Sequence, residues 1–121
     1  MSSTSISCLV LGKFRHIAEG IASRLPTTDF SVAAILDEHS FSAANVGIVS
    51  RALAPRPKAL IIGGGFSDDE AQAATKAWGE YVKEVGVEGT AVVRVSPGTL
   101  EKVGPAGVTD YVLEELKTKF K

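Results

Sequence analysis

Cysteine and long apolar runs are scarce in this 121-residue sequence. Its one cysteine, Cys8, cannot form a disulfide within the chain, so we expect a reducing compartment, by default a cytoplasmic one. No apolar run approaches the roughly 20 residues that a membrane-spanning helix needs, which predicts no membrane partner. The opening residues MSSTSIS have neither the basic region nor the apolar region of a signal peptide, and none is expected.

An excess of either charge is also lacking. The chain has 13 Lys and Arg against 14 Asp and Glu, which gives a formal net charge of −1. A protein that neutralises nucleic-acid phosphates usually carries a basic excess, so we expect no nucleic-acid partner. The sequence also has no P-loop lysine motif, no Gly-x-Ser-x-Gly elbow and no Cys and His spacing typical of zinc. We therefore expect no metal and no cofactor.

Apolar residues, by contrast, make up 45% of the chain, and no linker divides it. Residues 1–121 are therefore expected to form a single domain with its own core. Four apolar runs predict strands: Ile6–Leu11, Val32–Leu36, Ala59–Ile62 and Ala91–Val95. Three of these runs are almost unbroken, as in strands that are covered on both faces of a parallel sheet. The fourth contains Arg94, whose charge favours an edge strand.

A helical pattern follows each of these runs. The first has an apolar stripe at Phe14, Ile17, Ala18, Ile21, Ala22 and Leu25. The second is expected to be capped by Ser40, with a stripe at Phe41, Ala44, Ile48, Val49 and Ala52. In the third, Ser67 and Glu70 read as a capping box and Gly86 as the residue that ends the helix. The fourth is expected to begin near Pro105.

This alternation predicts an α/β three-layer sandwich with a four-stranded parallel sheet and right-handed crossovers. The strand order could be 2-1-3-4, as in a shortened flavodoxin-like sheet, or 3-2-1-4, as in a shortened Rossmann-like sheet. The wholly apolar run Ala59–Ile62 suits a central strand and favours the first order. A sheet of four strands is small, so we also expect a homodimer that covers an exposed face or edge.

In both orders the loop after the first strand lies beside the topological switch point, where such folds bind ligands. The residues of this loop that would line the crevice are Gly12, Lys13, Arg15 and His16. A dinucleotide fingerprint is not present, because Phe14 and Ile17 occupy its second and third glycine positions. Asp37, at the end of the second strand, could still accept hydrogen bonds from a ribose.

Three groups of residues could bind an anion at this crevice. Lys13, Arg15 and His16 would stand at a helix start, where cations oppose the helix dipole unless a phosphate or carboxylate binds them. The run Gly63, Gly64 and Gly65 could supply backbone N–H groups to a ligand, although a tight turn with positive φ would also explain it. Ser96 and Thr99 could add hydroxyl groups, or simply form a turn.

Proton transfer is a further possibility at the same crevice. His16 or His39 could act as general acid or base, oriented by Asp37. Their plainer roles are an exposed loop histidine and an aspartate that caps the second helix.

The sequence therefore predicts a domain that binds a small anionic ligand, a phosphorylated or carboxylated metabolite or a nucleotide, at the C-terminal edge of the sheet. Two alternatives stay open. One is a small cofactor-independent lyase or isomerase that uses the His and Asp side chains. The other is a protein-interaction scaffold whose crevice is empty.

Overall fold

The computed structural model describes residues 6–25, 30–37, 42–53 and 56–120. Its elements, in chain order, are β1 Ile6–Leu11, α1 Arg15–Arg24, β2 Phe30–Leu36, α2 Ala43–Ala52, β3 Ala59–Ile62, α3 Asp68–Val85, β4 Ala91–Arg94 and α4 Pro97–Lys119. The strands are all parallel and lie in the order β2-β1-β3-β4. The predicted three-layer α/β sandwich and the order 2-1-3-4 are confirmed, and the order 3-2-1-4 is wrong.

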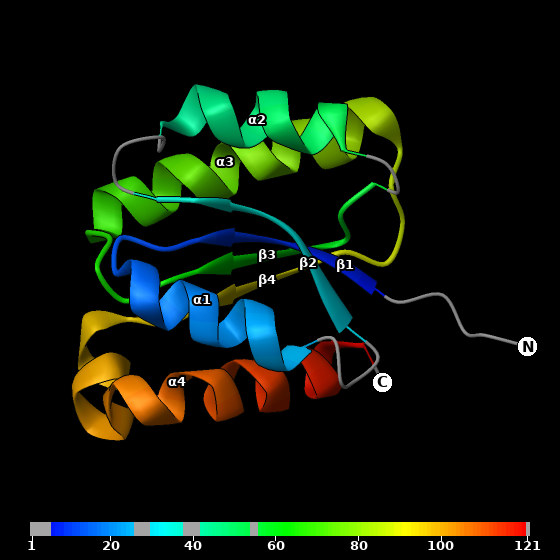
Figure 1. The fold of residues 1–121 in the computed structure, drawn as a ribbon. Coiled ribbons are helices and arrows are strands. Elements are labelled where there is room, and N and C mark those ends of the chain that lie inside the picture. Colours follow the sequence, from blue (N-terminus) through cyan, green and yellow to red (C-terminus); the bar gives the residue numbers. More distant parts are fainter. Residues whose placement is uncertain (1–5, 26–29, 38–41, 54–55, 121) are drawn as a thin grey trace, which may run out of the picture.

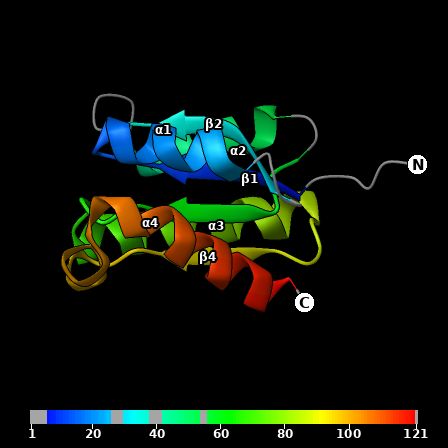
Figure 2. The ribbon, with the colours of Figure 1, turned by 60° about the horizontal axis from the view of Figure 1, so that its bottom comes forward.

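The helices cover the two faces of the sheet in pairs, α1 with α4 and α2 with α3 (Figures 1 and 2). The central strand β1 alternates between the two cores: Cys8 and Val10 pack on the α1 and α4 side, and Leu9 and Leu11 on the other. Burial raises the pKa of the Cys8 thiol to about 12, so this cysteine serves as inert packing. No helix in the described ranges is long and apolar enough to cross a bilayer.

The edge strands differ from each other. β4 carries Arg94, whose Nη2 lies 2.7 Å from an Asp68 carboxylate oxygen on α3, as the charge in this run led us to expect of an edge. β2 begins at Phe30, two residues before the predicted start, because Phe30 is buried beside Phe120. The register of β2 against β1 shifts at Ala33, which bends this edge and moves the following side chains to the opposite face.

The structure corrects the predicted helix α2. Its N-cap is Ser42, whose hydroxyl accepts the Asn45 N–H at 3.1 Å, and the predicted cap Ser40 lies outside the described residues. The predicted apolar stripe is wrong in three members, because Ala44, Ile48 and Ala52 are exposed. Val49 does pack against the core, and Phe41 lies outside the described residues. The buried side is formed instead by Val46, Gly47 and Ser50. Small side chains there allow α2 to pack close to its neighbours, and a count of apolar residues alone does not detect this.

Helix α4 begins earlier than the sequence predicts. Ser96 caps it by accepting the Thr99 N–H at 3.1 Å, and Pro97 is its first residue, so the turn predicted for residues 96–99 is wrong. Gly104, at φ 74° and ψ 165°, interrupts the helix, and its second part begins near the predicted start at Pro105. A glycine is suited to such a break because residues with a Cβ rarely adopt positive φ.

The capping box of α3 is confirmed. The Ser67 hydroxyl accepts the Glu70 N–H at 3.1 Å, and the Glu70 carboxylate accepts the Ser67 N–H at 2.9 Å. The same carboxylate oxygen accepts a hydrogen bond from Lys13 Nζ at 3.1 Å, which connects the helix to the loop after β1. These bonds, the Ser67 N–H first and Lys13 next, lower the pKa of Glu70 below its ordinary value of 4.5.

Replacing Glu70 with Gln should therefore lower stability at neutral pH and have a smaller effect in acid. A carboxyl whose pKa is lower in the folded protein stabilises it above the unfolded pKa, and the contribution is lost as the pH falls through the folded value. Urea unfolding of the wild type and of Glu70→Gln at pH 7 and pH 3 measures the difference. An equal difference at both pH values would show that the charge of Glu70 does not stabilise the fold.

Candidate functional site

The loops after β1 and β3 meet at the C-terminal edge of the sheet, where the sequence places the ligand crevice. The Gly12 N–H donates to the Leu36 carbonyl at 2.9 Å, and the Gly63 N–H donates to the Leu11 carbonyl at 2.7 Å. The hydrogen bonding of the sheet thus continues into both loops. Gly12 and Gly63 lie together as the predicted strand order requires.

The three glycines after β3 let these loops approach one another closely. An added Cβ would lie 2.9 Å from the Leu11 carbonyl oxygen at Gly63, 2.8 Å from Leu100 Cβ at Gly64 and 2.9 Å from Lys13 Cβ at Gly65. None of the three has positive φ, so the alternative explanation by a positive-φ turn is wrong. Other segments of the same chain therefore lie directly against the backbone of these glycines.

Little space is left at the predicted crevice. The hollow there measures about 10 Å³ and is lined by Lys13, Phe14, Ile17, Gly63, Gly64, Leu100 and Val108. This is about the minimum needed for one water molecule. Phe14, at the second glycine position of the failed fingerprint, and Leu100 of α4 contribute large side chains to it. A metabolite does not fit inside this hollow.

The polar residues predicted for the crevice have other partners or lie apart from it. Lys13 bonds Glu70 and lies 5.4 Å from the centre of the Phe66 ring, so its charge at a helix start is balanced without a ligand. Ser96 and Thr99 bond each other at 2.9 Å. Asp37 is half-buried just after β2.

The predicted acid–base residues are only partly visible. His39 and the side chain of Arg15 lie outside the described residues, so the pair of His39 with Asp37 stays a prediction. His16 is exposed on the first turn of α1, and its imidazole has no hydrogen-bond partner in the described part of the chain. An imidazole that acts as a base is normally oriented by a second group.

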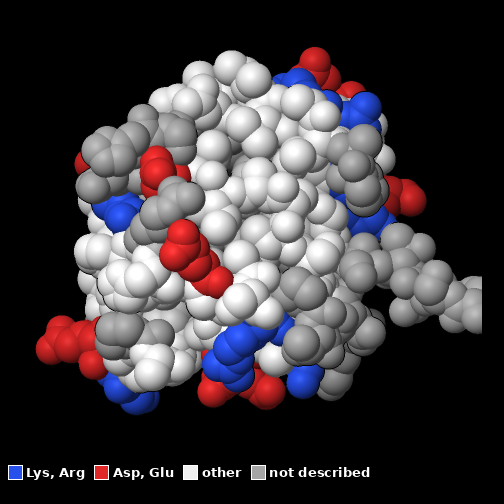
Figure 3. Space-filling view, viewed as in Figure 1, with Lys and Arg blue, Asp and Glu red and all other residues white. Residues whose placement is uncertain are grey.

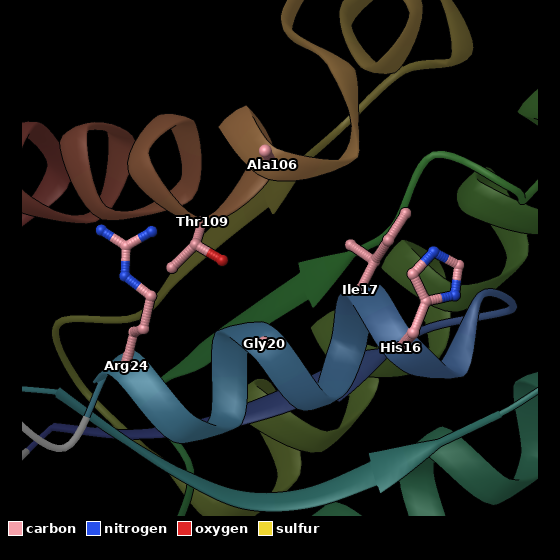
Figure 4. A pocket seen from close by; sticks show the side chains of 6 residues that line it. All are labelled: His16, Ile17, Gly20, Arg24, Ala106 and Thr109. Carbon is pink, nitrogen blue, oxygen red and sulfur yellow. The ribbon is translucent and has the colours of Figure 1, made fainter.

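A larger hollow lies next to the crevice, between α1 and α4. This groove measures about 290 Å³ and is lined by His16, Ile17, Gly20, Arg24, Ala106 and Thr109 (Figure 4). His16 and Arg24 stand near its two ends on α1, eight residues or about 12 Å apart along the helix axis. Gly20 has no side chain to fill the middle of the groove.

Thr109 is the most informative residue of the groove. It is only 6% exposed as a residue, and it lines the groove opposite Gly20. Two other helical threonines bond the carbonyl four residues earlier, Thr75 to Ala71 at 2.8 Å and Thr118 to Glu114 at 3.0 Å. Among the described residues, the buried side-chain atoms without a hydrogen-bond partner are Ser50 Oγ and two nitrogens of Arg94, so the Thr109 hydroxyl is not an unsatisfied buried group. In Figure 4 its oxygen is turned toward the space between the helices.

Arg24 lines the same groove. Its guanidinium donates to the Asp110 carboxylate at 2.6 Å and so joins α1 to α4. Ala106 lies in the first turn after the Gly104 break and lines the same groove.

Sequence reasoning missed most of this groove. It identified His16 but not Gly20, Arg24 or Thr109, which belong to no motif. The available signal was Gly20, a helix-weakening residue in the middle of α1. Its meaning depends on which residue of α4 faces it, and only the tertiary structure shows that this is Thr109.

Comparisons with known proteins add no name to this site: no protein-family model, no curated protein and no solved structure matches the chain. Within the described residues, no group of three His, Cys, Asp or Glu side chains is placed to hold a metal ion.

Two glycine substitutions test whether the chain itself fills the crevice. Gly63→Ala should destabilise the protein by about 2 kcal/mol, because its Cβ would meet a backbone oxygen that cannot move aside. Gly79→Ala, in the interior of α3 with no atom near its Cβ, should stabilise it by about 1 kcal/mol. Thermal unfolding compares the two, and a Gly63→Ala variant as stable as the wild type would mean that the loops are not closely packed.

Proposed function

We propose that this protein binds a small anionic metabolite in the groove between α1 and α4. The observation that carries the proposal is a groove of about 290 Å³ lined by the polar side chains of His16, Arg24 and Thr109. That volume is close to the lower end of the range for small-molecule sites. The ligand class is the one that the sequence predicts, and its place is beside the switch-point crevice rather than within it.

The groove suggests how such a ligand would lie. Its phosphate or carboxylate would be bound by His16 or Arg24, which line the same side of the groove. Its body would lie over Gly20, where no side chain intervenes, and a polar atom of the ligand would bond the Thr109 hydroxyl. A molecule that reaches both ends spans about 12 Å, so an elongated dianion such as a sugar bisphosphate suits the groove better than a compact one.

Binding accounts for these features better than catalysis does. The described groove has one imidazole, His16, and its one aspartate neighbour, Asp110, is engaged with Arg24. Acid–base catalysis by His16 would need a group that orients it, and the described residues provide none. A binding site needs only complementary charge, one hydrogen-bonding hydroxyl and space.

Substituting Thr109 with Val should separate stability from binding. Valine has nearly the same shape and removes only the hydroxyl that lines the groove, so the stability of the free protein should change little. The wild type should be stabilised by a member of a panel of sugar phosphates, nucleotides and dicarboxylates, by about 2.7 kcal/mol at 100 times its dissociation constant. Thr109→Val should lose most of this increase in melting temperature.

Thr75→Val is the matched control, because its hydroxyl already bonds a backbone carbonyl and lies on α3. This variant should keep the full ligand-induced increase in melting temperature. If Thr109→Val keeps the full ligand-induced increase, the hydroxyl does not contact the ligand and the proposal loses its main support. A panel that gives no shift with the wild type would contradict the binding function itself.

Gly20→Leu should block the groove while keeping the fold. The added side chain would project toward Thr109, since even a Cβ at Gly20 lies 3.9 Å from its hydroxyl oxygen. Gly79→Leu makes the same exchange on α3, where nothing lies within 4 Å. Calorimetric titration with the best compound should show binding to Gly79→Leu and at least tenfold weaker binding to Gly20→Leu; equal affinities would place the ligand elsewhere.

A further inference from the structure

Helix α2 has a second apolar side that the fold leaves uncovered. Val46, Gly47 and Ser50 face the interior, whereas Ile48 is 62% exposed and shares the outer side with Ala44 and Ala52. The helix has a single charged residue, Arg51, and that side chain pairs with Glu84 of α3. A helix that is apolar on both sides is usually buried on both sides.

The uncharged surface extends beyond the helix. Figure 3 shows the front of the molecule, where α2 and the edge strand β2 form a broad uncharged area with charged groups at its margin. The sequence of β2, FSVAAIL, has no charged residue, in contrast to the other edge strand with Arg94. Within this uncharged surface Ile48 is the large apolar side chain that α2 exposes, and exposed apolar areas mark association sites.

Next to Ile48 lies a hollow of about 270 Å³ between α2 and α3. Its walls are alanines, Ala43 and Ala44 on α2 and Ala73 and Ala77 on α3, and its rim carries Lys76 and Glu80. Ala44 is one helical turn before Ile48, so a large apolar side chain and a shallow groove lined by small ones stand side by side on the same face.

We infer that a second copy of this chain covers this face, in a twofold-symmetric dimer. A twofold axis in the plane of contact, perpendicular to α2 and α3, makes both helices antiparallel to those of the partner. Ile48 of each copy then lies in the alanine-lined hollow of the other copy. A patch that carries both the projecting and the receiving element is self-complementary, as such a dimer requires.

Charge complementarity supports this occupant. Lys76 and Glu80 are one turn apart on α3, have opposite charges, and form no ion pair within the part of the chain that the structure describes. An axis that crosses α3 between them places Lys76 beside Glu80 of the partner subunit, and Glu80 beside the partner's Lys76. Two reciprocal ion pairs then flank the apolar contact and set its orientation.

Sedimentation equilibrium of the full chain between 5 and 500 µM tests the proposal. The wild type should change from monomer to dimer over this range, and Ile48→Glu should remain monomeric while circular dichroism shows an unchanged fold. Phe14→Glu, at the other exposed large apolar side chain of the described chain, is the control and should still dimerise. A wild type that is monomeric at 500 µM, or an Ile48→Glu variant that dimerises like the wild type, would overturn the proposal.

A charge exchange tests the orientation of the two copies and involves little risk to the fold, because both side chains are exposed. Lys76→Glu alone and Glu80→Lys alone should each weaken the dimer at least fivefold, since each brings like charges together across the axis. The double variant K76E/E80K should restore the wild-type dissociation constant. Failure of the double variant to recover would contradict the antiparallel arrangement.

Discussion

The close approach of the loops after β1 and β3 determines what this fold can bind. Because residues 63, 64 and 65 are glycines, neighbouring segments lie closer to their backbone than a Cβ would permit. The side chains of Phe14 and Leu100 occupy the space that remains between the loops. Related sheet topologies generally use this position for a ligand. Here the hollow between the described residues is about the size of one water molecule, so these loops contribute to packing.

The two helical layers then differ in what they expose. Between α1 and α4, polar side chains of His16, Arg24 and Thr109 line a groove. On α2 and α3, Ile48 is exposed beside an alanine-lined hollow. A small charged molecule suits the first layer and a protein surface suits the second. The two sites lie on opposite faces of the sheet, so both can be occupied at once.

Most of the fold could be predicted from local patterns. Apolar runs located all four strands, the capping box located the start of α3, and Arg94 marked an edge strand, because each of these signals depends on neighbouring residues. Helix α2 was oriented wrongly, since its small buried residues Gly47 and Ser50 look less apolar than the exposed Ile48. An apolar stripe shows which side of a helix avoids water, but it does not tell the core of the chain from an outer contact.

The site was harder to predict than the fold for a physical reason. Strand order places loops at one edge, but whether a hollow remains there depends on side chains from distant segments, such as Leu100 against Gly64. The groove itself depends on Gly20 facing Thr109, two residues 89 positions apart that no motif relates. Only His16 belongs both to the predicted site and to the groove that the structure shows.

The most direct test of ligand binding in this groove is an amide chemical-shift titration by NMR. Inorganic phosphate and a sugar bisphosphate would be added to the 15N-labelled full chain, and the shift of each amide followed. The groove predicts that the largest changes cluster at Gly20, Ala106 and Thr109, with little change at Gly63, Gly64 and Gly65. Changes concentrated at those three glycines, or no saturable change anywhere, would contradict it.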